Sequence, residues 1–172
     1  LLTPVFERLR QVRAGLSEDT VRILHIGDSH VRGHIYPQTT GTLLKETFGA
    51  VSYTDMGVNG ATCLTFTHPG RIADIAAMKP ELLILSFGTN ESHNRRYNVN
   101  LHYNQMDELV KLLRDSLPDV PILLTTPPVL TKVSGKGGGN VRTPSIPGRL
   151  QRQKQFAVMP KIIVCSCGIC TM

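Results

Sequence analysis

The sequence lacks tryptophan altogether and is poor in aromatic residues, which make up 5% of its 172 residues. It also lacks any run that approaches the ~18 continuous apolar residues of a membrane-spanning helix. Hydrophobic residues nevertheless reach 41%, which is enough for a packed core and excludes a disordered tail. A chain of this length is expected to form a single domain over residues 1–172.

Acidic residues are missing from the last quarter of the chain. Residues 131–172 contain seven Lys and Arg and no Asp or Glu, whereas residues 1–130 contain the other 12 basic and all 13 acidic residues. The net charge of +6 therefore comes from this C-terminal segment. Because the basic residues do not gather on a module with stacking aromatic side chains, the pattern argues against nucleic-acid binding.

Cysteine is scarce, with four residues in the whole chain. This number is too small for the disulfide framework of a small secreted protein. The Cys165-x-Cys167-x-x-Cys170 spacing near the C-terminus could suit a metal. Structural zinc takes four ligands, however, and neither His nor Asp lies near these cysteines. We therefore expect neither a metal site nor a cofactor.

Segments with the composition of strands alternate with segments of helical spacing. The predicted strands are residues 21–27, 50–53, 81–87 and 120–125. The predicted helices are residues 39–48, 71–78 and 103–117. Such alternation predicts an α/β fold in which helices cover both faces of a parallel sheet.

The two ends of the chain are less regular than this core at residues 21–130. Residues 1–20 form an N-terminal leader segment for which the pattern predicts no element. The chain begins without Met and shows no charged segment followed by an apolar one, so we expect a processed chain or a piece of a longer one. Within the basic tail, we expect a loop at 132–148, a polar helix at 149–158 and a last strand at 161–165.

Glycine-containing polar loops follow the first three predicted strands. They are Gly27-Asp28-Ser29-His30, Gly57-Val58-Asn59-Gly60-Ala61-Thr62 and Gly88-Thr89-Asn90-Glu91. The carboxyl ends of parallel strands meet at one edge of the sheet, so we expect these loops to converge there. A nucleophilic serine needs a base for its proton and donors for the oxyanion that forms. Ser29 is the candidate nucleophile. Three groups are candidate donors for the oxyanion: the N–H groups of Ser29 and Gly60 and the Asn90 amide.

In order and spacing, these loops resemble the first three sequence blocks of the SGNH (GDSL-type) hydrolase family, over about residues 21–130. The resemblance implies a flavodoxin-like three-layer α/β/α sandwich that hydrolyses acyl esters without metal or cofactor. It implies that Ser29 is the nucleophile and that Gly60 and Asn90 are oxyanion donors. The variants GDSH, NGAT and GTNE are most similar to a bacterial branch of carbohydrate and peptidoglycan O-acetylesterases. A small-molecule or glycan ester as substrate, and a periplasmic or secreted location, follow from the resemblance alone.

One block of the family pattern is missing. The family takes its base from an Asp-x-x-His block near the C-terminus, but this chain has no Asp after Asp119 and no His after His102. We therefore expect a truncated or frame-shifted chain of weak activity, because general-base catalysis contributes ~10²–10⁴ in rate. His30 is adjacent to Ser29 and His93 follows the third loop, and we expect both to be solvated histidines rather than substitute bases.

Two other functions remain open. One is a non-catalytic domain of the same fold that binds glycan or is a remnant. The other is a doubly wound domain for a small ligand or nucleotide, against which the absence of a GxGxxG or GxxxxGK[ST] fingerprint argues. Considered singly, Gly60 fits a turn glycine and Asn90 a capping residue. Glu91 is expected to be a loop carboxylate, and His25 a buried, hydrogen-bonded core histidine.

Overall fold

The computed structural model describes residues 2–93, 96, 98–125 and 163–165 of the chain. The loop predicted at 132–148, the helix predicted at 149–158 and the last two cysteines lie outside the described residues. None of the helices in the described part combines the length and apolar composition that crossing a membrane requires.

A five-stranded sheet of order β2-β1-β3-β4-β5 forms the centre of the molecule. Its strands are β1 (Val21–Gly27), β2 (Val51–Gly57), β3 (Leu82–Ser86), β4 (Ile122–Thr125) and β5 (Ile163–Cys165). The first four are parallel and β5 is antiparallel to β4. The predicted α/β fold is confirmed. Within the described residues, the sheet departs from the predicted parallel arrangement at β5, on an edge where an antiparallel strand is common.

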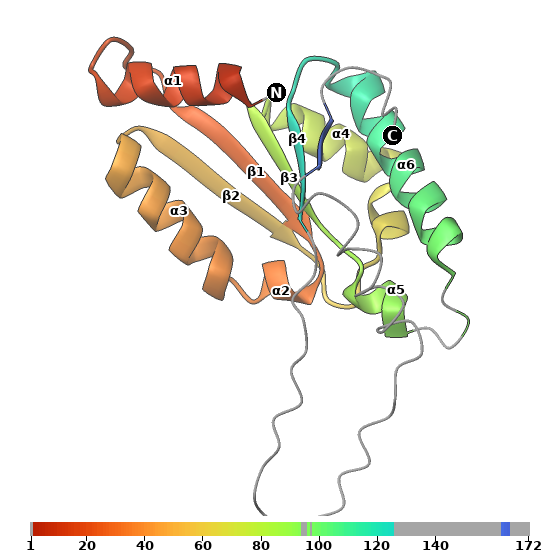
Figure 1. Cartoon of the computed structure of the whole chain (residues 1–172). Helices are drawn as coiled ribbons and strands as arrows, with labels where there is room; N and C mark the ends of the chain where they lie inside the picture. The colour runs from red at the N-terminus through yellow and green to blue at the C-terminus, as the bar shows by residue number, and fades with distance from the viewer. Residues whose placement is uncertain (1, 94–95, 97, 126–162, 166–172) are drawn as a thin grey trace, which may run out of the picture.

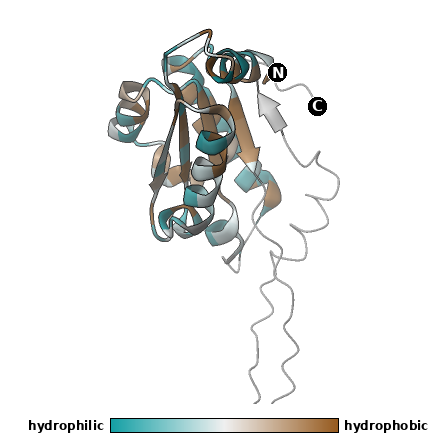
Figure 2. Ribbon diagram, turned by 90° about the vertical axis from the view of Figure 1, so that its left-hand side faces the viewer, coloured by the Kyte–Doolittle hydropathy of each residue, from teal (hydrophilic) through white to brown (hydrophobic). Residues whose placement is uncertain are grey.

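Helices cover both faces of the sheet and complete three layers (Figure 1). One face carries α1 (Thr3–Arg13) and α3 (Ile35–Phe48). The other carries α4 (Pro69–Ala77), α6 (Val99–Ser116) and the short 3-10 helix η1 (Cys63–Phe66). The strands between them are largely apolar, whereas the helices mix apolar and polar residues (Figure 2). Two layers of apolar side chains, one on each face, therefore hold the helices on the sheet.

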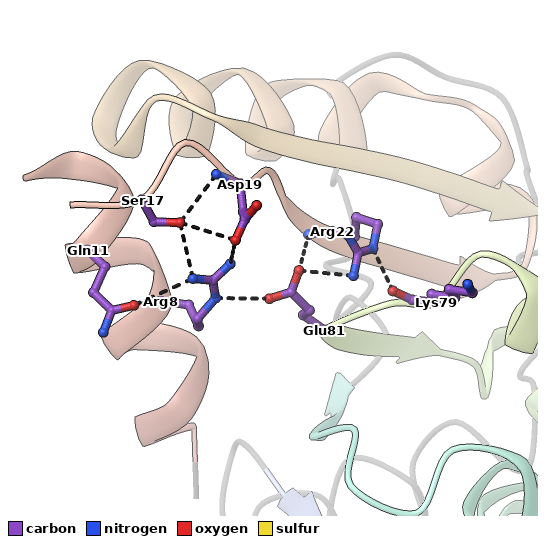
Figure 3. Close-up of polar contacts among 7 residues, drawn as sticks. All are labelled: Arg8, Gln11, Ser17, Asp19, Arg22, Lys79 and Glu81. Atoms are coloured by element: carbon purple, nitrogen blue, oxygen red, sulfur yellow. Dashed lines mark hydrogen bonds and ion pairs between the residues drawn. The ribbon is translucent and has the colours of Figure 1, made fainter. Parts of the chain in front are cut away.

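The α1 helix lies in the leader segment, where the pattern predicts no element. Its buried side chains are Val5, Leu9 and Val12, at the spacing of one helical face. Arg8 lies 3.4 Å from Glu81, and Glu81 also lies 3.3 Å from Arg22 of β1 (Figure 3). Such partly exposed ion pairs contribute only ~0–1 kcal/mol each, so the apolar stripe holds α1 and the charges fix its register.

The α3 helix begins at Ile35 rather than at the predicted residue 39. Its first turn contains Pro37, which a helix accepts there because the first N–H groups have no partner within the helix. The helix returns the chain from the end of β1 to the start of β2. It also brings Tyr36 over the sheet close to the carboxyl edge, where that side chain contacts His25 of β1.

Candidate active site

Ser29 is the first residue of a short helix, α2 (Ser29–Arg32), directly after β1. The side chain of Asp28 caps this helix and accepts a hydrogen bond from the backbone N–H of His30 at 2.8 Å. The helix begins at Ser29 because Asp28 supplies the cap. Asp28 is buried and Ser29 is exposed, so the turn presents the serine at the carboxyl edge of the sheet.

Two glycines allow α2 to lie directly against the strand ends. A Cβ atom at Gly57 would lie 2.1 Å from the backbone nitrogen of Arg32 and 2.5 Å from its Cα. A Cβ atom at Gly27 would lie 2.6 Å from the carbonyl oxygen of Ser86 and 2.5 Å from a methyl group of Val31. The position of the serine therefore depends on Gly27 and Gly57, the residues that end β1 and β2, because a side chain at either would clash with α2.

The second loop is hydrogen-bonded to the first. The backbone N–H of Val58 donates to the carbonyl of Gly27 at 3.0 Å. Gly60 is exposed and has a φ of +73°, a backbone conformation that glycine adopts without strain. Its N–H forms no hydrogen bond within the described part of the chain, so it remains available as a donor.

Asn90 connects the third loop to the second. It lies in α5 (Thr89–His93), and its side-chain amide donates to the carbonyl of Ala61 at 2.8 Å. The backbone N–H of Asp28 in turn donates to the carbonyl of Ser86 at 3.3 Å, which ties the first loop to β3. The loops that contain Ser29, Gly60 and Asn90 thus lie at one edge of the sheet, where α2 and α5 are found (Figure 1).

Glu91 is buried, not the loop carboxylate that the sequence predicts. One carboxylate oxygen accepts the backbone N–H of Cys63 at 2.9 Å and the other accepts the N–H of Gly88 at 2.8 Å. The prediction is wrong because residues 89–93 form a helix that turns this side chain inward, below the loops. Burial, together with the charge and hydrogen bond of Glu91, raises the pKa of the Cys63 thiol to about 12.

Two histidines near the carboxyl edge of the sheet pair with carboxylates and not with Ser29. The Nδ1 atom of His30 lies 3.0 Å from Asp28, and that of His34 lies 2.7 Å from Asp55. Among the described residues, no imidazole forms a hydrogen bond with the Ser29 hydroxyl. The side chain of His93, the other histidine considered as a base, lies outside what the structure describes.

His25 is buried and hydrogen-bonded, as the sequence predicts. Its Nδ1 atom lies 2.7 Å from the Tyr53 hydroxyl, and its Nε2 atom lies 2.6 Å from Ser86 Oγ and 2.8 Å from the Tyr36 hydroxyl. Burial lowers the pKa of His25 from 6.5 to about 4, although Asp55 acts in the opposite direction. The imidazole is therefore neutral at pH 7 and joins β1, β2 and β3 on the face that α3 covers.

We expect this histidine to make the fold sensitive to acid. Its folded-state pKa lies below the unfolded value, so the unfolded chain binds the proton more readily. His25 therefore does not lower the free energy of unfolding above pH 6.5. As the pH drops from about 6.5 to about 4, that free energy falls, by at most about 1.4 kcal/mol per pH unit. Urea unfolding from pH 4 to 7 measures this slope. It should flatten in His25→Asn and persist in His30→Asn, and equal slopes in all three proteins would contradict the assignment.

The parallel sheet of order 2-1-3-4, with its polar loops at the carboxyl edge, places the chain in the flavodoxin-like class of α/β proteins. Within that class, the model of the GDSL-like lipase/acylhydrolase family matches residues 25–168. The chain belongs to this family and is a hydrolase by family. The resemblance to SGNH (GDSL-type) hydrolases is thereby confirmed.

Solved structures of the same fold include several esterases. One described as a peptidoglycan O-acetylesterase in action has a TM-score of 0.71 at 18% identity, over 90% of this chain and 80% of that one. A GDSL-like lipase from Bacteroides thetaiotaomicron has a TM-score of 0.52 at 19% identity, over 89% and 70%. An acetylxylan esterase from Geobacillus stearothermophilus has a TM-score of 0.51 at 20% identity, over 80% and 69%. Identities this low establish the fold only. A search of curated proteins found no match.

Proposed function

We propose that this protein is a serine ester hydrolase that removes acyl groups, acetyl above all, from a carbohydrate. The observation that carries the proposal is the hydrogen-bonded edge itself, where the Asn90 amide holds the Gly60 loop through Ala61. The exposed Ser29 lies on the neighbouring turn, which Val58 joins to that loop. The carbohydrate part of the proposal rests on the fold neighbours named for peptidoglycan and acetylxylan. We take residues 1–172 as one domain, since the family match runs through most of the chain.

In the proposed reaction, the Ser29 oxygen attacks the acyl carbonyl carbon and its proton passes to a base. The carbonyl oxygen becomes an oxyanion, which the N–H groups of Ser29 and Gly60 and the side-chain amide of Asn90 stabilise. The intermediate then collapses: the protonated base gives its proton to the departing alcohol and an acyl-serine remains. Water, losing its proton to the base, attacks the acyl-serine in the same way, and the acid leaves as the serine oxygen takes the proton back. The Asn90 amide is positioned by its hydrogen bond to the Ala61 carbonyl and Ser29 by the Asp28 cap of α2, so we expect little reorganisation during the reaction.

The proton acceptor is the weak part of the proposed active site in this chain. No described imidazole contacts the Ser29 hydroxyl, and the chain has no Asp-x-x-His after residue 119. We expect slow hydrolysis that imidazole in solution accelerates by acting as the base. The rates of p-nitrophenyl acetate hydrolysis with and without imidazole, in the unaltered chain and in Ser29→Ala, measure this effect. The Ser29→Ala protein also corrects for the reaction of imidazole with the ester itself.

A fluorophosphonate probe tests the nucleophile directly. We expect mass spectrometry to locate its adduct on the peptide that contains Ser29, and we expect Ser29→Ala to lose the label completely. The matched control is Ser52→Ala, which removes an exposed serine of β2 near the opposite end of the sheet. Labelling on another serine, or labelling that survives Ser29→Ala, would refute the proposed role.

The missing base block favours a second candidate, a non-catalytic domain of the same fold that binds glycan. It predicts binding of acetylated oligosaccharides with neither probe labelling nor an effect of imidazole. Isothermal titration with acetylated xylo-oligosaccharides and with peptidoglycan fragments, beside the labelling experiment, separates the two functions.

A further inference from the structure

Three side chains of zinc-binding type meet below the candidate active site. Cys63 comes from η1, Glu91 from α5 and His102 from α6. One potential ligand atom from each, namely the sulfur, a carboxylate oxygen and an imidazole nitrogen, lies within 4.8 Å of the others. The Nδ1 atom of His102 lies 3.8 Å from Oε1 of Glu91. We propose that these three residues bind a divalent transition-metal cation of the zinc type.

The distances are close to those of a formed site. Zinc binds sulfur at about 2.3 Å and nitrogen or oxygen at about 2.0–2.2 Å. Ligand atoms around such an ion lie roughly 3–4 Å apart, so the cluster needs to contract by only about 1 Å. The side chains of Glu91 and His102 are 7% and 11% exposed, and Cys63 is fully buried. The three donors are therefore held in place by packing, not by a flexible surface loop.

The charge balance favours a cation at this position. Within the described part of the chain, no Lys or Arg forms an ion pair with the buried carboxylate of Glu91. A divalent ion would exchange the Cys63 S–H bond for a sulfur–metal bond and release the proton to solvent. Thiolate and carboxylate then carry two negative charges against the two positive charges of the ion. The buried site becomes neutral overall, with the imidazole as a neutral third ligand.

The donor set selects the kind of ion. Thiolate and imidazole prefer zinc and its neighbours among the transition metals, whereas magnesium and calcium require oxygen ligands. Three protein ligands leave a fourth position, as in zinc sites that retain a water molecule. An ion here would join η1, α5 and α6 through one centre. It would thereby stabilise the Glu91 contacts to Cys63 and Gly88, beside the loop that contains Asn90.

Cobalt titration is the direct test, because a cobalt–thiolate bond gives a charge-transfer absorption that other ligands do not. Cys165, Cys167 and Cys170 could bind cobalt themselves, so all three are first replaced by serine in the full-length chain. In this background, Cys63 is the only thiol. We expect one cobalt per chain with a thiolate absorption band, and displacement of the cobalt by zinc. Zinc should also raise the melting temperature.

Single substitutions in that background decide the ligands. Cys63→Ala should abolish the band, and His102→Gln should weaken binding by more than about 100-fold, since even indirect contacts to a metal contribute 10–100-fold. His34→Gln is the control, because it removes a histidine that pairs with Asp55 outside the cluster. Circular dichroism verifies folding of each variant. No band in the background protein, a band that survives Cys63→Ala, or equal loss in His34→Gln would overturn the site. None of these measurements depends on ester hydrolysis.

Discussion

Replacing Asn90 with alanine should lower kcat for ester hydrolysis by about 10²–10³-fold, with little change in KM. In the proposed function, the side-chain amide stabilises the oxyanion, a charge that exists only after Ser29 has attacked. Loss of such a donor raises the energy of the transition state and leaves substrate binding nearly unchanged. Steady-state kinetics with p-nitrophenyl acetate in the presence of imidazole measure both constants.

The control for this substitution must account for the structural role of Asn90, whose amide also donates to the Ala61 carbonyl. Ser92→Ala removes a comparable hydrogen bond in the same helix, from a buried hydroxyl to the Thr89 carbonyl at 2.7 Å. It should lower the melting temperature and leave kcat within a few-fold. Asn90→Asp keeps the shape of the side chain but adds negative charge, so it should be as slow as Asn90→Ala. A normal kcat in Asn90→Asp would mean that the amide is not an oxyanion donor.

Gly57→Ala should destabilise the fold by about 3 kcal/mol or more, the upper range for overpacking. The new Cβ would lie 2.1 Å from the backbone nitrogen of Arg32 and 2.5 Å from its Cα. Backbone atoms cannot turn away as a side chain can, so β2 and α2 must separate. We expect a fall of about 10 °C in melting temperature, measured by calorimetry. Fluorophosphonate labelling should also be lost, because Ser29 moves with α2.

Gly33→Ala is the matched control for this result. Gly33 caps the C-terminus of the same helix with a φ of −68°, which any residue adopts. Its Cβ would lie 3.3 Å from the Ser29 carbonyl oxygen and 3.9 Å from that of His30. We expect a change within about 1 kcal/mol. Similar melting temperatures for the two variants would show that the contact between Gly57 and α2 does not constrain the fold.

Much of the fold follows from local composition. The strand predicted at residues 21–27 matches β1, and the near-continuous apolar run at 81–87 contains β3. The longest predicted helix, 103–117, lies almost wholly in α6, which begins four residues earlier at Val99. The helix ends are less predictable, because caps such as Asn98, which accepts the N–H of Leu101, act through single side chains. Strand β2 extends to Gly57 past Asp55, a polar residue with weak strand preference.

The positions of Ser29, Gly60 and Asn90 at one edge could be predicted without coordinates, because parallel strands place all their carboxyl ends on the same side. The burial of Glu91 could not, since it depends on a partner 28 residues away, Cys63, and on a helix of five residues. The same holds for the meeting of Cys63 with His102 and for the contact of Gly57 with α2. Periodicity and composition are local properties and therefore decide elements and their order. Contacts between segments distant in the chain depend on packing in three dimensions, and here only the folded structure decided which buried groups support the site.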